Sequence, residues 1–119
     1  YLPYARGGGY LLSSDLVQYL VDSAPRSRAY RAEDVTFGTW LAPLEILRHH
    51  DVRFDTEYRS RGCSHDFLIT HKKSPLSMEE LHANLKASNG EKLCTQEVVH
   101  ARPYVYNWDV LPSKCCELR

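Results

Sequence analysis

Four cysteines, Cys63, Cys94, Cys115 and Cys116, constrain the folding of this chain more than any other feature of its sequence. They form an even set without Cys-x-x-Cys spacing, which favours disulfides in an oxidising compartment over a zinc ribbon or a thioredoxin-type site. A bond between the adjacent Cys115 and Cys116 would be strained, so we expect Cys63 and Cys94 to pair with the two terminal cysteines. Four reduced, buried thiols in a cytosolic protein are the alternative.

The charge balance of the chain excludes one class of partner. Its 119 residues include 15 basic and 15 acidic side chains, so the overall field that attracts nucleic acid is missing. We therefore expect no nucleic-acid partner. The sequence contains no apolar run of the ~20 residues that a membrane helix needs. It begins without Met, and we expect it to be a piece of a longer protein.

Apolar residues recur at helical spacing in two segments of the N-terminal half. Hydroxyl and acidic side chains at residues 13–15 precede the first segment and predict a capped helix. Its packed face should consist of Leu16, Val17 and Leu20. The second segment covers residues 35–47, where Pro43 should kink or divide the helix.

The C-terminal half alternates extended and helical patterns. Residues 48–65 predict a loop with a short strand, and residues 67–70 predict a buried strand that ends before His71. A capping box at residues 77–80 predicts a third helix that stops at Asn89–Gly90. Its inner face should consist of Met78, Leu81 and Leu85. Further extended segments are predicted at residues 98–99 and 104–106. One α/β unit without repeats accounts for this order.

Two local patterns could bind a substrate. Gly7-Gly8-Gly9 precedes a helix, where backbone amides can approach an anion, although a plain tight turn explains the same residues. Glu33 and Asp34 precede a helical segment, where carboxylates cap free amides. One such carboxylate could instead accept a proton as a general base.

His71 is a third candidate, because it ends an apolar strand, where ligands gather in α/β sheets. A lone histidine is also a common structural residue. The motifs of zinc proteases and serine hydrolases are absent from the sequence.

Three segments occur in a recognisable order: residues 4–13 (YARGGGYLLS), residues 33–38 (EDVTFG) and residues 68–71 (LITH). They resemble the successive C-terminal motifs of the β1,3-glycosyltransferase family, which includes β1,3-galactosyltransferases and the fringe enzymes. Residues 54–64, residues 70–72 and the Cys115–Cys116 tail resemble the branch that adds the second galactose of the glycosaminoglycan-protein linker.

The resemblance implies that residues 1–119 form the C-terminal part of a single catalytic domain with a GT-A nucleotide-sugar transferase fold, an α/β architecture. It implies an inverting enzyme that moves galactose from UDP-galactose to a terminal galactose of the linker on a proteoglycan core. Asp34 would be the catalytic base, and His71 would be a ligand of Mn²⁺. The residues that would line the substrate cleft are Tyr4, Gly8, Gly9 and Glu33.

Members of this family are type II proteins of the Golgi membrane with a lumenal catalytic domain. The family's Asp-x-Asp metal motif is absent from this chain, and Asp55-Thr56-Glu57 lies too far along the sequence to replace it. We expect a preceding N-terminal part to supply the nucleotide site and the membrane anchor, and we expect this piece alone to be inactive.

Two alternatives remain open. One is a sister β1,3-glycosyltransferase with another donor or acceptor. The other is a noncatalytic, disulfide-stabilised interaction domain, in which Glu33 and Asp34 only cap a helix and His71 only packs.

Overall fold

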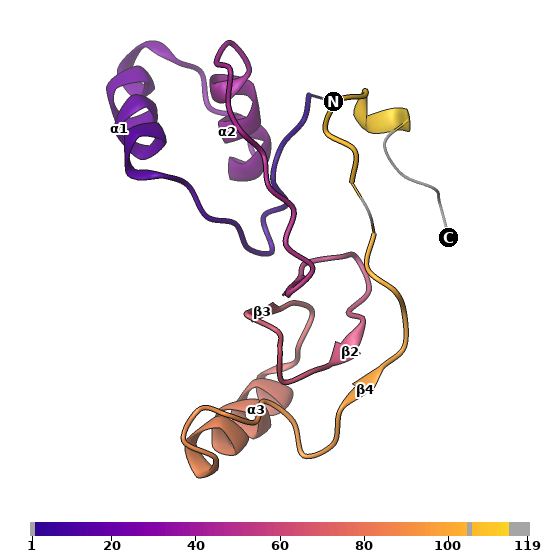
Figure 1. Ribbon diagram of the computed structural model, residues 1–119. Coiled ribbons are helices and arrows are strands. Elements are labelled where there is room, and N and C mark those ends of the chain that lie inside the picture. Colours follow the sequence, from indigo (N-terminus) through magenta and orange to yellow (C-terminus); the bar gives the residue numbers. More distant parts are fainter. Residues whose placement is uncertain (1, 105, 115–119) are drawn as a thin grey trace. The chain divides into compact units, whose positions relative to one another are not determined.

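A computed structural model describes residues 2–104 and 106–114 of the chain (Figure 1). Contacts divide the chain into two compact units, one formed by Tyr1–His50 with Tyr104–Arg119 and the other by Asp51–Pro103. Helices and short strands are both present, as the predicted α/β class requires. Within the described ranges, no helix combines the length and the apolar character needed to span a bilayer.

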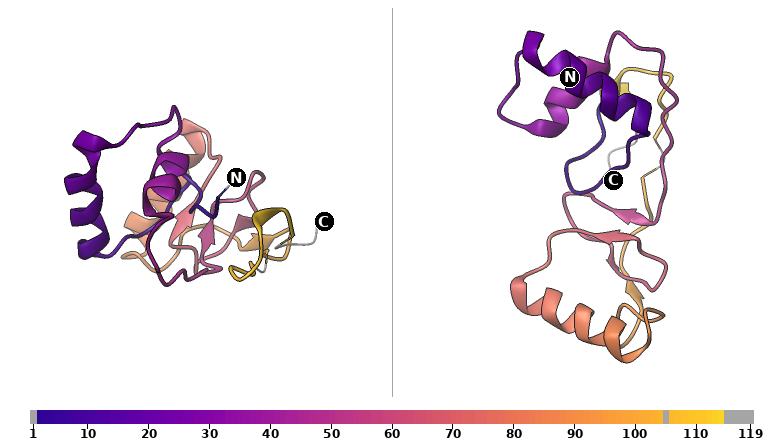
Figure 2. Two further views of the ribbon diagram at one scale, coloured as in Figure 1. Left: turned by 90° about the horizontal axis from the view of Figure 1, so that it is seen from above. Right: turned by 90° about the vertical axis from the view of Figure 1, so that its left-hand side faces the viewer.

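The first unit is helical. Helices α1 and α2 lie side by side in it (Figure 2), and their buried leucines are Leu20 of α1 and Leu41 of α2. Its elements are α1 (Ser14–Ser23), the 3₁₀ turn η1 (Ala24–Arg26), α2 (Glu33–Leu41) and the 3₁₀ turn η2 (Pro112–Lys114).

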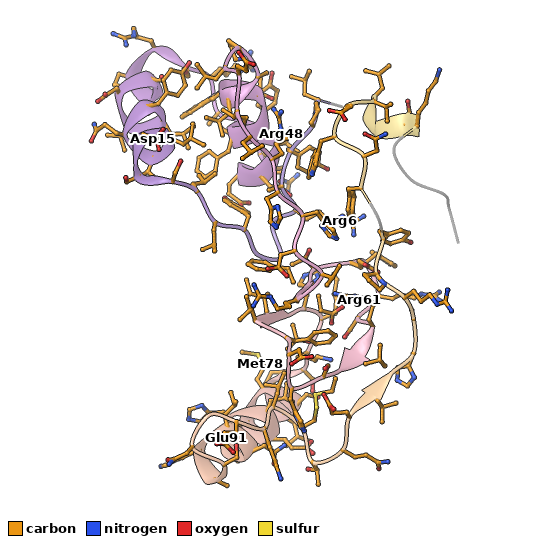
Figure 3. The ribbon with its side chains drawn as sticks, viewed as in Figure 1. Arg6, Asp15, Arg48, Arg61, Met78 and Glu91 are labelled. Carbon is orange, nitrogen blue, oxygen red and sulfur yellow. A yellow bond between two sulfur atoms is a disulfide. The ribbon has the colours of Figure 1, made fainter. Side chains whose placement is uncertain are left out.

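Helix α1 confirms the predicted start but not the whole predicted face. Ser13 is the N-cap residue, but its side chain makes no capping hydrogen bond to a backbone amide. Asp15 lies in the first turn (Figure 3), and a hydrogen bond from the Ser13 side chain lowers the pKa of its carboxyl. Leu20 is buried, whereas Val17 is 45% exposed, so its predicted packing is wrong.

Helix α2 ends at Leu41, two residues before Pro43, and no helix follows in residues 42–47, so the predicted helix stops before this proline and the expectation that it continues, kinked or divided, is wrong. Thr36 ties the helix to the preceding loop: its hydroxyl donates to the carbonyl of Ala32 at 2.9 Å and accepts from the N–H of Tyr30 at 2.9 Å. The ring of Trp40 donates to the carbonyl of Arg28 at 3.0 Å. These bonds fix the loop that leads into the acidic start of α2.

The second unit contains two small sheets and one helix. The parallel pair joins β1 (Phe54–Asp55) to β3 (Ile69–Thr70), with Asp55 opposite Thr70. The antiparallel pair joins β2 (Gly62–Cys63) to β4 (Val98–Val99). The predicted strand at 67–70 is therefore shorter than expected, and the expectation that it is buried is wrong because Leu68 is 58% exposed. Tyr104 and Tyr106 lie outside the strands, and residue 105 lies outside the described residues.

Helix α3 (Pro75–Ala87) begins two residues before the predicted capping box at residues 77–80. Its N-cap is Ser74, whose hydroxyl accepts the N–H of Ser77 at 3.1 Å, and Pro75 occupies the first turn. Proline suits this place because it lacks an N–H and has a helical φ. Met78 is 61% exposed, so its predicted inward position is wrong.

The end of α3 is as predicted. Asn89 and Gly90 both have positive φ, at 58° and 89°, and Gly90 donates to the carbonyl of Leu85. This left-handed turn stops the helix.

A disulfide joins Cys63 to Cys94 in the second unit. The predicted pairing of these two cysteines with the C-terminal pair is therefore wrong. Strand β2 and the segment after α3 approach to a Cα–Cα distance of 6.2 Å, which the sequence pattern did not indicate. Cys115 and Cys116 lie outside the described residues. The GT-A assignment, and the inclusion of both units in one catalytic domain, remain predictions.

Candidate active site

Asp34 is fixed through both oxygens of its carboxylate. Oδ2 accepts the N–H of Gly7 at 3.0 Å, and Oδ1 accepts the N–H of Val35 at 2.8 Å. The second bond is the capping role that a carboxylate can play in the first turn of a helix. The bond from Gly7 is not a helix cap, because its donor lies outside α2. It ties the glycine run to the start of α2. Each oxygen retains a lone pair that a capping bond does not use.

Glu33 is held by a neighbouring phenol. Tyr10 donates from its hydroxyl to Oε1 of Glu33 at 3.1 Å, and its ring meets Phe37 edge-on with centroids 6.2 Å apart. Burial, the hydrogen bond to Glu33 and the negative charges of Glu33 and Asp34 raise the pKa of Tyr10 to about 12. At neutral pH Tyr10 is therefore a hydroxyl donor that orients the Glu33 carboxylate.

The glycine run forms a turn, in which the N–H of Gly9 donates to the carbonyl of Arg6 at 3.2 Å. The interpretation as a tight turn is thus confirmed, and the same turn also contacts the acidic pair. A Cβ added at Gly7 would lie 3.1 Å from Oδ2 of Asp34. Close approach to Asp34 is the reason that this position favours glycine.

Tyr4 packs against α2, because a side chain at Gly38 would overlap its Cβ. Within the first unit the structure therefore brings Glu33 and Asp34 together with Gly7 and Tyr10. The predicted cleft residues Gly8 and Gly9 belong to the same turn as Gly7. The glycine run was predicted as a possible binding turn, but the contacts of Gly7 with Asp34 and of Tyr10 with Glu33 were not predicted.

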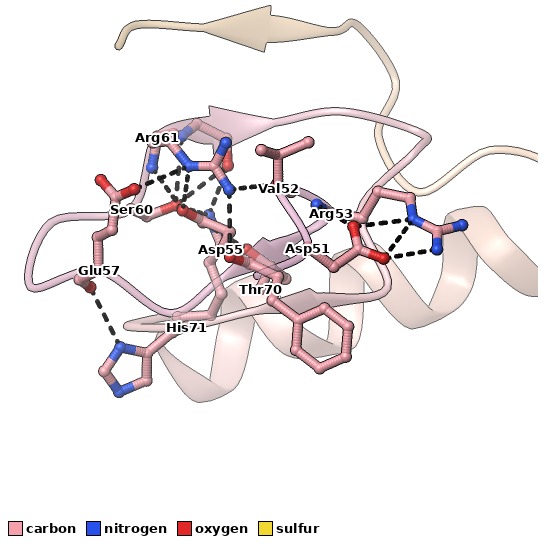
Figure 4. Close-up of polar contacts among 12 residues, drawn as sticks. Asp51, Val52, Arg53, Asp55, Glu57, Ser60, Arg61, Thr70 and His71 are labelled. Carbon is pink, nitrogen blue, oxygen red and sulfur yellow. Dashed lines mark hydrogen bonds and ion pairs between the residues drawn. The ribbon is translucent and has the colours of Figure 1, made fainter. Parts of the chain in front are cut away.

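His71 directly follows β3 in the second unit, as predicted (Figure 4). Its N–H donates to the carbonyl of Asp55 at 3.0 Å, and its ring Nδ1 lies 3.4 Å from the carbonyl oxygen of Glu57. The side chain is half-buried. Its successor Lys72 has a positive φ of 60°, which turns the chain sharply after the strand.

In the second unit, His71 could supply one ligand to a divalent metal ion such as Mn²⁺. An imidazole is a suitable ligand for such an ion. No group of three His, Cys, Asp or Glu side chains that could hold a metal is found in the part of the chain that the structure describes. His71 would thus be one ligand among others.

A buried charged cluster surrounds the backbone that contacts His71, and sequence reasoning missed it. Asp55 is 0% exposed, and Arg61 and Glu57 are also buried. The Nε atom of Arg61 lies 3.4 Å from Oδ1 of Asp55 and 3.5 Å from Oε1 of Glu57. The only local signal was the spacing of Glu57 and Arg61 four residues apart, which also occurs between solvated charges.

Comparisons with known proteins agree on one family. The signature of the family described as Galactosyltransferase matches residues 1–52, which include the cluster around Asp34. The chain is 53% identical over 117 residues to β-1,3-galactosyltransferase 6 of Mus musculus, covering 98% of this chain and 35% of that protein.

Two further relatives are more distant. Hydroxyproline O-galactosyltransferase GALT5 of Arabidopsis thaliana is 33% identical, covering 79% of this chain and 14% of that protein. UDP-GalNAc:β-1,3-N-acetylgalactosaminyltransferase 2 of Homo sapiens is 32% identical, covering 68% of this chain and 16% of that protein. The chain thus spans about a third or less of the length of these relatives. No solved structure matches it significantly.

Proposed function

Because this chain belongs to the galactosyltransferase family, we propose that it is the acceptor-activating part of an inverting β1,3-glycosyltransferase. The donor would be UDP-galactose, and the acceptor would be a terminal galactose of the glycosaminoglycan-protein linker on a proteoglycan core. The observation that supports this most strongly is the fixing of Asp34 by the N–H of Gly7, within the residues that match the family.

Asp34 would act as the general base. The acceptor hydroxyl attacks the anomeric carbon of the donor, the bond from that carbon to the diphosphate oxygen breaks, and Asp34 takes the hydroxyl proton. An α-linked donor thereby gives a β-linked product. A single carboxylate suffices if it lies within about 2.6–3.2 Å of the reacting hydroxyl. The two backbone amides that hold Asp34 would orient its free lone pairs before the acceptor binds.

Glu33 would bind the acceptor beside the base. Tyr10 donates to Oε1 of Glu33, which leaves Oε2 as an acceptor for a sugar hydroxyl. This division of work gives the adjacent acids different roles: Glu33 positions the acceptor and Asp34 takes its proton. The turn at Gly8–Gly9 and the ring of Tyr4 would complete this side of the substrate cleft.

His71 would hold Mn²⁺, whose charge, when the ion is bound, offsets the charge that develops on the departing diphosphate. The remaining ligands and the nucleotide site would come from a preceding part of the protein, together with a type II membrane anchor. We place the catalytic domain in the Golgi lumen. The disulfide between Cys63 and Cys94 supports such an oxidising compartment.

A sister activity is the second candidate, because one relative is named as an N-acetylgalactosaminyltransferase. Incubating the full-length protein with UDP-galactose, UDP-N-acetylgalactosamine or UDP-N-acetylglucosamine and a galactose-terminated linker acceptor separates the two. We expect a β1,3-linked galactosyl product. Preferential transfer of an N-acetylhexosamine would select the sister activity, and an α-linked product would contradict the inverting mechanism.

A further inference from the structure

The carboxylate of Asp55 is fully buried and accepts three hydrogen bonds from nearby residues (Figure 4). Oδ1 accepts the N–H of Arg61 at 2.9 Å, and Oδ2 accepts the hydroxyls of Ser60 at 2.6 Å and Thr70 at 3.2 Å. These bonds come from two places in the sequence, the loop at residues 60–61 and strand β3. The Asp55 carboxylate therefore links that loop to the residue that precedes His71.

The side chain of Arg61 bonds the backbone on the N-terminal side of the same loop. Its Nη2 donates to the carbonyl of Val52 at 2.6 Å and to that of Phe54 at 3.2 Å. Its guanidinium also lies over the ring of Phe67, 5.1 Å from the centroid. A buried ion pair adds little net stability compared with apolar packing, because removing charges from water costs about as much as their attraction returns. What these bonds do accomplish is to hold the backbone of residues 55–61 in one conformation.

This fixed backbone is what contacts His71. The carbonyl of Asp55 accepts the N–H of His71, and the carbonyl of Glu57 faces its ring Nδ1. A carbonyl oxygen can only accept a hydrogen bond, so this 3.4 Å contact is a hydrogen bond when Nδ1 carries the proton. The neutral ring then has its lone pair on Nε2, the arrangement in which a histidine binds a metal through one nitrogen and a backbone carbonyl through the other.

We propose that Asp55 is a positioning residue for His71: by linking Thr70 to the loop that presents the Glu57 carbonyl, it selects the Nδ1–H tautomer and leaves Nε2 free to bind a divalent cation. The second half of this proposal rests on the proposed role of His71 as a metal ligand. The first half concerns the tautomer alone.

The test is a measurement of the His71 tautomer by two-bond ¹H–¹⁵N spectra of the full-length protein labelled at histidine nitrogens, at mildly alkaline pH. The His71→Ala variant assigns the signal. We expect wild type to show the Nδ1–H form. Asp55→Asn places an amide donor among the existing donors, so we expect a mixture of tautomers. Mn²⁺ alone, titrated into the same samples, should bind about 10- to 100-fold more weakly to the variant.

Thr70 provides a milder pair of variants if Asp55→Asn does not fold. Thr70→Val removes one donor to Oδ2 of Asp55 while keeping the β-branched shape, and Thr70→Ser keeps the hydroxyl. We expect the mixed tautomer in the valine variant and the wild-type form in the serine variant. Asp51→Asn is the matched control, because it removes a carboxylate whose ion pair with Arg53 is at the surface.

Wild-type tautomer in both Asp55→Asn and Thr70→Val, or an Nε2–H form in wild type, would overturn the positioning role. A second outcome would reject only the proposed role of His71 as a metal ligand. In that outcome the tautomer changes in the variants as expected, but His71→Ala binds Mn²⁺ as tightly as wild type. In that case Asp55 still positions His71, and His71 is not a metal ligand.

Discussion

The backbone N–H of Gly7 donates a 3.0 Å hydrogen bond to the carboxylate of Asp34, 27 residues further along the chain. This bond connects two segments that the sequence could only treat separately, a glycine turn and an acidic helix start. The glycine turn therefore does more than reverse the chain, because it also holds the Asp34 carboxylate. The carboxylate that it holds is the one proposed as the base.

Gly7→Ala tests the closeness of this contact. The new Cβ would lie 3.1 Å from Oδ2 and 3.4 Å from Cγ of Asp34, so the carboxylate must move by a few tenths of an ångström. We expect kcat of the full-length protein to fall about tenfold, because small displacements of a catalytic group are costly. Wild-type kcat in a folded variant would show that the bond to Gly7 does not position the base.

Tyr10→Phe tests how Glu33 is held. The substitution removes the hydroxyl that bonds Oε1 of Glu33 but keeps the ring beside Phe37. We expect KM for the acceptor to rise several-fold with a smaller change in kcat, because Glu33 is proposed to bind the acceptor. Initial-rate kinetics with varied acceptor measure this. An effect on kcat alone would contradict the division of roles between Glu33 and Asp34.

The raised pKa of Tyr10 also predicts a pH dependence of stability. The pKa is about 12 in the folded chain against an ordinary value of 10.0, so the folded state retains a proton that the unfolded state loses. The stability contributed by this group is fully present below about pH 10 and is lost as pH rises toward about 12. Urea unfolding at several alkaline pH values should show a steeper loss in wild type than in Tyr10→Phe. Tyr30→Phe is the control, since the ring of Tyr30 is exposed.

The buried and the surface arginine of the second unit should differ in their effect on stability. Arg61→Met leaves Asp55 and Glu57 buried without their cation, so we expect the free energy of unfolding to fall by about 3–5 kcal/mol. Arg53→Met removes a pair with Asp51 in which the Arg53 side chain is 54% exposed, and should cost at most about 1 kcal/mol. Urea denaturation compares the two. Equal losses would show that the buried cluster is not what holds the loop.

The disulfide between Cys63 and Cys94 can be tested directly by chemical mapping. Peptide mapping of the full-length protein without reduction should recover the Cys63 peptide linked to the Cys94 peptide. Replacing both cysteines by serine should lower the free energy of unfolding by about 3 kcal/mol, because the bond closes a loop of 31 residues. A Cys63 peptide linked to Cys115 or Cys116 would instead restore the pairing expected from the sequence.

Local signals account for what the sequence predicted correctly. Apolar spacing placed α1 and α2, and Asn89–Gly90 placed the end of α3, because these features depend on neighbours within one or two turns. The start of α3 was misplaced because two local signals competed. Ser74-Pro75 and the box at residues 77–80 both describe helix starts, and the proline pattern prevailed.

The features that the sequence missed depend on tertiary contacts. Cys63 meets Cys94 only because β2 and the segment after α3 come together, and no spacing rule encodes that approach. Asp55 and Arg61 lie in a polar stretch that looks solvated, yet the structure buries both. Asp34 and His71 were candidates from local patterns and received their roles from the family resemblance, whereas the contacts of Gly7 and Tyr10 with the acidic pair emerged only from the hydrogen bonds of the folded chain.

The most direct test of the proposed function is the turnover of the full-length protein with Asp34→Asn, compared with Asp15→Asn. Both acids lie in the first turn of a helix, so the comparison cancels the effect of losing a charge there. With circular dichroism unchanged, we expect Asp34→Asn to lower kcat by at least about 100-fold and Asp15→Asn to leave it near wild type. If Asp34→Asn retains the kcat of wild type, Asp34 is not the base and the proposed mechanism is wrong.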